Sequence, residues 1–297
     1  MLNGVLAINK PRGMTSHDVV FKLRKILKTK KVGHTGTLDP EVDGVLPICI
    51  GPATRISDYI MNSGKRYTAE ITIGIQTTTE DQTGEIISAD KIVNDQYSNE
   101  EIDDALAALT GHIEQMPPMF SAVKVKGRKL YEYARAGLVI DRPTRMVHIK
   151  NIERTTDLHY CDDTMRFSIE VSCGKGTYIR TLATQIAEKL NTVGHMSKLT
   201  RTESGGFMLE DCYTLEQIAE TEDVQLLLRP IEEGLKDLPQ LSVDETIKTR
   251  VKNGQKFRMD ELPVTEPTVI VSEKKALAIY APHPEKAGQV KAIKVFS

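Results

Sequence analysis

Two carboxylates, Asp39 and Asp43, are the side chains of this sequence best placed to do chemistry. They lie in a segment, residues 31–55, whose glycines permit backbone conformations that other residues resist. Pro40 fixes the turn after Asp39 and biases Asp39 itself towards an extended conformation. The apolar run at residues 45–50 predicts a short buried strand, closed by a Gly-Pro pair. A carboxylate held between rigid turns and a buried strand is typical of a positioned reactive group.

Residue types alone allow three interpretations of Asp39. A single carboxylate can act as a nucleophile or stabilise charge on a sugar or base. Asp39 and Asp43 together could serve as the acid and base of a hydrolase. Asp39 could also cap its own loop in an Asx turn, which is a purely structural role. The pattern by itself leaves all three open.

Motifs for cofactors and metals are absent from the sequence. It contains no GxGxxG, no GxxxxGK[ST] and no HExxH. The four cysteines have no CxxC spacing and no ligand-like spacing to histidines, which argues against both a zinc site and a disulfide framework. We therefore expect a reaction that needs no metal and no cofactor, in the reducing environment of the cytoplasm.

Five segments resemble, in order, the motifs of the TruB-type pseudouridine synthases, which modify the T arm of transfer RNA. They are GVLAINKPRGMTSHDVV from Gly4, KKVGHTGTLDPEVDGVLPICIGPATR from Lys31, KRYTAEITIGIQTTTEDQTGE from Lys65, QMPPMFSAVKVKGRKLYEYAR from Gln115 and CGKGTYIRTLA from Cys173. The resemblance covers roughly residues 4–210. The aspartate segment and the GTYIRTLA run are together highly specific, and no motif position used below is substituted.

The resemblance implies the roles of the reactive groups. Asp39, which precedes Pro40, corresponds to the family's nucleophile, whereas Asp43 does not. Arg180 corresponds to the arginine that pairs with the nucleophile, a contact that can be bidentate and fix the orientation of the carboxylate. Tyr67 is expected to stack on the target base and to assist proton transfer. An exposed helix arginine and a plain strand tyrosine are the structural alternatives.

The resemblance also implies residues that contact RNA. Tyr178 and Leu199 correspond to positions that line the base pocket, although core packing is a serious alternative for Leu199. His34 is expected to stack within the RNA loop from which bases are extruded, since flipping a base out of its stack costs a few kcal/mol. Phosphate-facing candidates are Lys10, Arg12, Lys124, Lys126, Arg128 and Lys129.

The elements that must position these residues predict an α+β fold. Strands are expected at residues 4–8, 66–75, 145–157 and 165–174, and helices at 18–27, 100–111, 130–137, 177–190 and 216–230. Helices and strands do not alternate as regular βαβ units, which disfavours a doubly wound sheet. The resemblance implies the pseudouridine synthase fold, with a central mixed, largely antiparallel sheet.

A domain boundary is expected near Leu235. We predict a catalytic domain at residues 1–235 and a small β-rich domain at 236–297, where short strands follow one another. The second domain resembles the PUA-like RNA-binding module of the family in position, though its sequence match is weaker. The sequence shows no apolar run long enough to span a bilayer, and because its first residues hold only a five-residue apolar patch we expect no signal peptide.

Charge is unevenly distributed along the chain, although its net value is only −2. Residues 1–66 hold eleven Lys/Arg against five Asp/Glu, and residues 121–150 hold eight against two. Residues 80–115 carry ten acids and one base. Because the basic blocks coincide with the motif-bearing segments, the chain can offer a basic face to phosphates.

These observations favour a stand-alone tRNA pseudouridine synthase that acts on uridine 55 of the T loop. The base would be flipped into the pocket, and we expect a monomer that needs no protein partner. Two alternatives remain: a binding module that remodels tRNA without catalysis, and a metal-free hydrolase that uses both Asp39 and Asp43.

Overall fold

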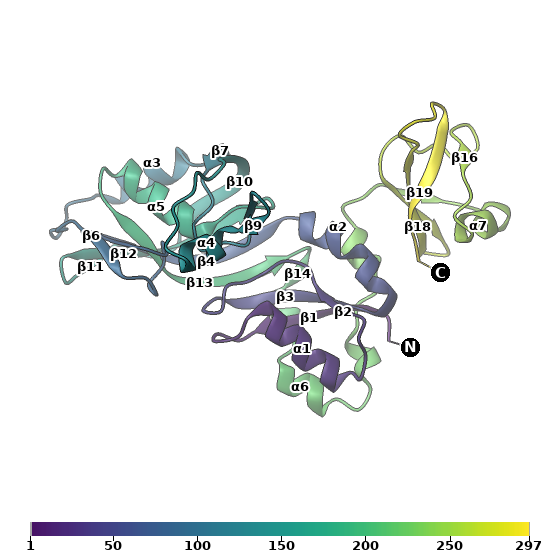
Figure 1. Ribbon diagram of the computed structural model, residues 1–297, viewed down its shortest axis with the longest axis horizontal. Helices are drawn as coiled ribbons and strands as arrows, with labels where there is room; N and C mark the ends of the chain where they lie inside the picture. Colours follow the sequence, from purple (N-terminus) through teal and green to yellow (C-terminus); the bar gives the residue numbers. More distant parts are fainter. Residues whose placement is uncertain (1, 297) are drawn as a thin grey trace.

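A computed structural model describes residues 2–296. Its main feature is a ten-stranded sheet whose central path runs β1-β3-β13-β4-β12-β10-β7 (Figure 1). These strands are β1 (Gly4–Lys10), β3 (Asp43–Ile50), β13 (Gly194–Ser204), β4 (Lys65–Ile73), β12 (Thr164–Cys173), β10 (Arg145–Arg154) and β7 (Gly111–Gln115). Short strands β2 (Val32–His34), β11 (His159–Cys161) and β14 (Phe207–Met208) join it at the side of this path.

Within the central path only β3 and β13 pair in parallel, and the other neighbours are antiparallel. The sheet is therefore mixed and largely antiparallel, which confirms the predicted α+β fold class. Side chains along β1 alternate between the two faces of the sheet, and each face packs in its own hydrophobic layer. Leu6 and Ile8 belong to one hydrophobic cluster, whereas Val5 and Ala7 belong to another.

Helices cover the first of these layers. They are α1 (Ser16–Ile26), α3 (Asn99–Ala107), α5 (Ile179–Lys189) and α6 (Leu215–Glu220), and the shorter α2 (Ser57–Asn62) and α4 (Leu130–Arg135) lie outside this layer. Local signals explain where the first two begin. Thr15 and Ser98 each form a reciprocal capping box with the acid three residues later, so both helices start one or two residues before the predicted positions.

The helix predicted at residues 216–230 is wrong over most of its length. Helix α6 ends at Glu220, and a 3-10 helix at Val224–Leu227 follows, capped by Asp223. The partly buried side chains of Val224, Leu227 and Leu228 pack against the main core. The acids at residues 220–223 interrupt the apolar periodicity, and packing against the core determines the path of this segment.

Two small hairpins project from the body. One is formed by β5 (Ile75–Thr77) and β6 (Ile86–Ala89), and the other by β8 (Lys124–Val125) and β9 (Arg128–Lys129). The second turns at Lys126 and Gly127, both of which have positive φ, as a tight hairpin turn of this kind requires.

The last part of the chain forms a separate five-stranded sheet of order β15-β17-β18-β19-β16, which stands to one side of the main body (Figure 1). Its elements are β15 (Gln240–Ser242), α7 (Glu245–Lys252), β16 (Phe257–Arg258), β17 (Thr268–Ser272), β18 (Lys275–Pro282) and β19 (Gln289–Val295).

The small sheet is not a freely tethered unit, because it shares a hydrophobic cluster with the main body. Val269, Val271 and Ile279 pack in one cluster with Ile56 and Ile60. Polar contacts reinforce this seam: the backbone N–H of Ala276 donates to Glu232, Lys294 lies 4.0 Å from Asp58, and the Arg55 guanidinium donates to the carbonyl of Val295.

Candidate active site

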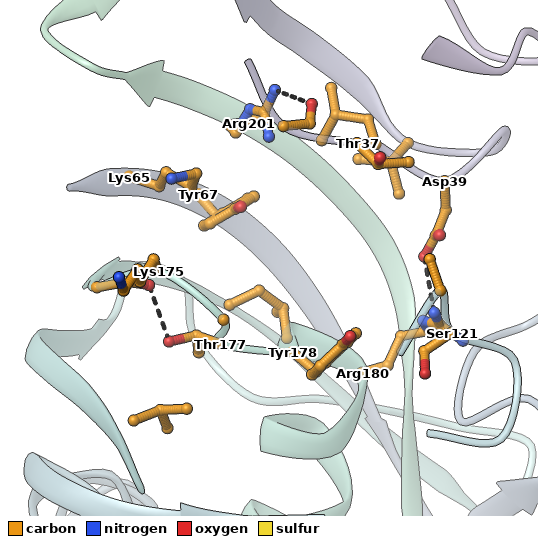
Figure 2. Close-up of a pocket in the computed structure, with 18 of the residues that line it drawn as sticks. Thr37, Asp39, Lys65, Tyr67, Ser121, Lys175, Thr177, Tyr178, Arg180 and Arg201 are labelled. Atoms are coloured by element: carbon orange, nitrogen blue, oxygen red, sulfur yellow. Dashed lines mark hydrogen bonds and ion pairs between the residues drawn. The ribbon is translucent and has the colours of Figure 1, made fainter. Parts of the chain in front are cut away.

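A pocket of about 680 Å³ opens where β4 and β13 meet the start of α5 and the loop that carries Asp39 (Figure 2). Asp39 is the single acid among its lining residues in the described chain. The basic lining residues are Lys65, Arg145, Lys175, Arg180 and Arg201. The pocket is therefore strongly positive around one carboxylate, which suits an anionic substrate.

The loop that carries Asp39 is fixed by hydrogen bonds from both sides. Ser16, at the start of α1, accepts from the backbone N–H of Leu38 at 2.9 Å and donates to its carbonyl at 3.3 Å. The Lys10 ammonium donates to the carbonyl of Pro40 at 3.1 Å. Leu38 and Val42 are buried on either side of the aspartate. The loop is thus anchored while the Asp39 side chain remains 43% exposed.

The prediction that Lys10 faces a phosphate is wrong. Lys10 is fully buried, and its ammonium also donates to the carbonyls of Pro11 and Met14. Burial lowers the pKa of this lysine to about 8. A side chain enclosed in this way supports the loop and is not available to RNA. The structural role of Lys10 could not be recognised in the sequence, because a lysine next to Pro11 and Arg12 is typical of an exposed basic turn.

Arg180 lies against Asp39, with its Nη2 atom 3.0 Å from Oδ2 of the carboxylate (Figure 2). The arginine is 5% exposed, so it is not the exposed helix residue of the structural alternative. Its N–H groups also donate to the carbonyls of Thr79 at 3.1 Å and Phe120 at 3.0 Å. Helix α5 begins at Ile179, which places Arg180 in the first turn and aims its side chain at the loop.

Asp43 has a different environment from Asp39. Its carboxylate accepts from the Thr200 hydroxyl at 2.6 Å and pairs with Arg12 at 3.0 Å. It does not line the pocket. These contacts tie β3 to β13 and to the turn after β1, which gives Asp43 a structural role and removes support for a paired-carboxylate site. Arg12, predicted to face phosphate, keeps a partly exposed guanidinium that is already engaged by Asp43.

Three other predicted site residues line this pocket: Tyr67, Tyr178 and Leu199. Tyr67 is 7% exposed, and burial raises the pKa of its hydroxyl, so this group is protonated at neutral pH. Burial also raises the pKa of Tyr178, which is half-buried at the start of α5. Leu199 is 8% exposed and packs within the main core while one side reaches the pocket.

His34 is not part of the pocket lining. It ends β2, and its ring lies edge-on to that of His17 with the centroids 5.1 Å apart. Burial lowers the pKa of His34, and the nearby charges of His17 and Arg201 act in the same direction. The ring is therefore neutral at neutral pH, which suits stacking better than a charge contact.

The four basic residues predicted from the third motif cluster on the β8–β9 hairpin. Lys124, Lys126 and Arg128 are exposed, whereas Lys129 is half-buried and donates to the hydroxyl of Tyr131 at 3.2 Å. Tyr131 lines the pocket, so the hairpin adjoins it.

Sequence reasoning missed Lys65, Ser121 and Arg201, all of which line the pocket. The signal for two of them was present: Lys65 is two residues from Tyr67, and Arg201 is two residues from Leu199, so each shares a strand face with a residue that was predicted. Ser121 is buried, and its hydroxyl has no hydrogen-bond partner among the described residues.

Within residues 2–296, no group of three or more His, Cys, Asp or Glu side chains is arranged to hold a metal ion. None of the helices in this part of the chain is long and apolar enough to cross a membrane.

Comparison with known proteins places this geometry in a family. Residues 24–179 match the N-terminal domain of the TruB family of pseudouridylate synthases, and residues 180–236 match the C-terminal domain of tRNA pseudouridylate synthase B. The chain is 55% identical to tRNA pseudouridine synthase B of Staphylococcus haemolyticus strain JCSC1435 over the whole of both chains. It is 54% identical, with the same coverage, to the protein of that name from Staphylococcus aureus strain MRSA252.

Solved structures give the same result for the fold. The chain superposes with a TM-score of 0.75 and 26% identity on a chain of a Cbf5–Nop10–Gar1 complex, covering all of this chain and 85% of that one. A chain of an archaeal box H/ACA Nop10–Cbf5 complex has a TM-score of 0.72 and 23% identity, with 100% and 86% coverage. The motifs, the pocket around Asp39 and Arg180, and the matches over the full length show that this chain belongs to the TruB family of pseudouridine synthases.

Proposed function

We propose that this protein converts uridine 55 in the T loop of tRNA to pseudouridine, with Asp39 as the nucleophile. In the net reaction the bond between N1 of uracil and C1′ of ribose breaks, and a bond between C5 and C1′ forms. The proton of C5 leaves and N1 takes up a proton, so the reaction is an isomerisation that needs no redox partner. The relatives named tRNA pseudouridine synthase B support tRNA as the substrate.

The observation that carries the proposal is the contact between Asp39 and Arg180 at the pocket. Arg180 is a permanent cation, and it lies 3.0 Å from the carboxylate that we propose as the nucleophile. The same contact fixes the direction of the carboxylate. The carboxylate is still partly exposed towards the pocket, so a sugar or base in the pocket can reach it.

The size of the pocket supports entry of a flipped nucleotide. A base inside a folded RNA loop cannot reach Asp39 unless it leaves its stack. Tyr67 and Tyr178 offer aromatic surface on which an extruded base can stack, and Leu199 offers an apolar contact. His34, on the adjacent β2 strand, remains our candidate for stacking within the RNA loop after the base has left it.

We propose that residues 1–235 form the catalytic domain and residues 236–297 a PUA-like RNA-binding domain. In the described chain no residue after Arg201 lines the pocket, which supports this division of roles. We also propose that the protein works as a monomer in the cytoplasm, where its four free cysteines would stay reduced.

Release of tritium from a T-arm hairpin labelled at C5 of the target uridine tests this function. The unmodified protein should release the label from uridine 55 and leave hairpins labelled at other uridines untouched. Release from another uridine with none from uridine 55 would contradict the proposed position, and no release at all would contradict the proposed activity.

A further inference from the structure

Arg201 is a buried cation without an acidic partner. It is 1% exposed and is the largest fully buried side chain of the described chain. Its Nε–H donates to the carbonyl of Val45 at 2.7 Å, and one Nη2–H donates to the carbonyl of Gly36 at 3.4 Å. No carboxylate among residues 2–296 forms an ion pair with it. Burying an unpaired charge is expensive, so its presence requires an explanation.

The two carbonyls explain where the guanidinium is held. Gly36 and Val45 lie at the two ends of the loop that carries Asp39, and Arg201 is paired with Gly44 across the parallel β3–β13 contact. That approach is so close that a Cβ on Gly44 would lie 2.2 Å from the carbonyl oxygen of Arg201. The backbone on both sides thus fixes the arginine, and only part of its five N–H groups is used.

Tyr67 is the neighbour of Arg201 on the adjacent strand. Arg201 on β13 is the direct register partner of Tyr67 on β4, so the two side chains leave the sheet on the same face. Both line the pocket, and Figure 2 shows them side by side on its wall. The guanidinium of Arg201 lies close enough to the Tyr67 hydroxyl to lower its pKa against the effect of burial.

A guanidinium has no acceptor, so in any hydrogen bond between these two side chains the tyrosine oxygen must accept. The hydroxyl proton of Tyr67 is then free to be directed elsewhere, and the open side is the pocket. We propose that Arg201 is a positioning residue that holds the Tyr67 hydroxyl as a hydrogen-bond donor towards the nucleotide in the pocket. This inference rests on the proposed function, and it adds a residue that acts through Tyr67.

The electrostatic surroundings of Tyr67 agree with a donor role. Burial raises the pKa of the hydroxyl, and the charge of Arg201 opposes this rise. Cys173 on β12 and Asp39 on the loop are the other ionisable groups that act on the hydroxyl, and both raise the pKa. The balance keeps Tyr67 protonated, as a donor must be.

A double-mutant cycle separates this role from a general support of the loop. Single-turnover tritium release is measured, with saturating protein, for the unmodified protein, Arg201→Met, Tyr67→Phe and the double variant. Arg201→Met should slow release on the order of 10²-fold, the scale of a lost positioned polar group. In the Tyr67→Phe background the same substitution should change the rate by no more than about 2-fold, because its target is gone.

Controls exclude trivial causes. Lys198→Met, on the same strand but paired with Glu70 at the surface, should release label at the unmodified rate. Hairpin affinity and circular dichroism should be unchanged in Arg201→Met. If that variant does not fold, Arg201→Lys takes its place in the cycle, since it keeps the charge and loses the forked geometry.

The inference would be overturned if the Arg201 substitution lowered the rate by the same factor in the unmodified protein and in the Tyr67→Phe background. Full activity of Arg201→Met would also overturn it. The absence of release by the unmodified protein would overturn the proposed function and this inference with it, so the two failures can be told apart.

Discussion

Nη2 of Arg180 and Oδ2 of Asp39 lie 3.0 Å apart, although one residue is in the first turn of α5 and the other in a loop before β3. The arginine is held by backbone carbonyls, and the carboxylate is held by an anchored loop. Neither side chain has to be ordered when substrate enters. Such preorganisation is the main way in which an active site lowers the energy of a developing charge.

Arg180→Met should lower the single-turnover rate on the order of 10²-fold or more, because the Asp39 carboxylate loses the cation that fixes its orientation. Arg180→Lys should lose less, because it keeps the positive charge but not the fork that also reaches Thr79 and Phe120. Rates of tritium release from a saturated hairpin measure both. Full activity of Arg180→Met would show that the pairing with Asp39 has no catalytic importance.

The imidazole of His34 should titrate below the ordinary histidine pKa near 6.5. Burial opposes its protonation, and the charges of His17 and Arg201 add to this effect. NMR of the ring protons, assigned with a His34→Gln variant, measures the midpoint. Since the ring is neutral above this midpoint, His34→Phe should bind the hairpin nearly as well as the unmodified protein. A midpoint above the ordinary histidine value of about 6.5 would contradict the structure.

Neutralising Lys124, Lys126, Arg128 and Lys129 together should raise KM more than it lowers kcat. Contacts to phosphates hold the ground state and the transition state alike. The slope of log affinity against log salt concentration should decrease in magnitude by about three, if all four side chains contact phosphates. Lys91→Gln, in the acidic segment at residues 80–115, is the control and should change neither quantity. A loss confined to kcat would instead place the hairpin in the chemical step.

Removing residues from Leu238 onward should destabilise the protein as well as weaken binding. The deletion would expose Ile56 and Ile60, which now pack against Val269, Val271 and Ile279. Ile279→Ala, within this seam, should cost about 2–5 kcal/mol of unfolding free energy by the usual cost of a buried cavity. Urea unfolding measures both changes.

Below its melting temperature the truncated protein should retain the chemical step at saturating hairpin, because in the described chain no residue beyond Arg201 lines the pocket. Loss of the chemical step in a folded truncated protein, with hairpin affinity unchanged, would show that the proposed domain division is wrong.

The sequence predicted the features that depend on neighbouring residues. The helices near residues 18–27 and 100–111 and the apolar run of β3 form close to the predicted positions, because the sequence signals that determine them are local. The pocket residues Tyr67, Tyr178 and Arg180 were identified through motifs of the family.

Features that depend on long-range packing could not be predicted in this way. The burial of Lys10 follows from the path of the Asp39 loop across it, and the position of Arg201 follows from the register of β13 against β4. The acids at residues 220–223 are a local signal for the end of the helix at Glu220, but the path of the following segment reflects the packing of Val224 and Leu228 on the core, which the local sequence does not reveal.

The most direct test of the account compares Asp39→Asn with Asp43→Asn in tritium release from uridine 55. The two carboxylates lie in the same segment, but only Asp39 contacts Arg180 and lines the pocket, whereas Asp43 pairs with Arg12 and Thr200. We expect Asp39→Asn to fold, to bind the hairpin and to release no label, because an amide is not a nucleophile. Asp43→Asn should release label at a rate close to that of the unmodified protein. Turnover by Asp39→Asn near the unmodified rate, or its loss in Asp43→Asn alone, would contradict the assignment of Asp39 as the nucleophile.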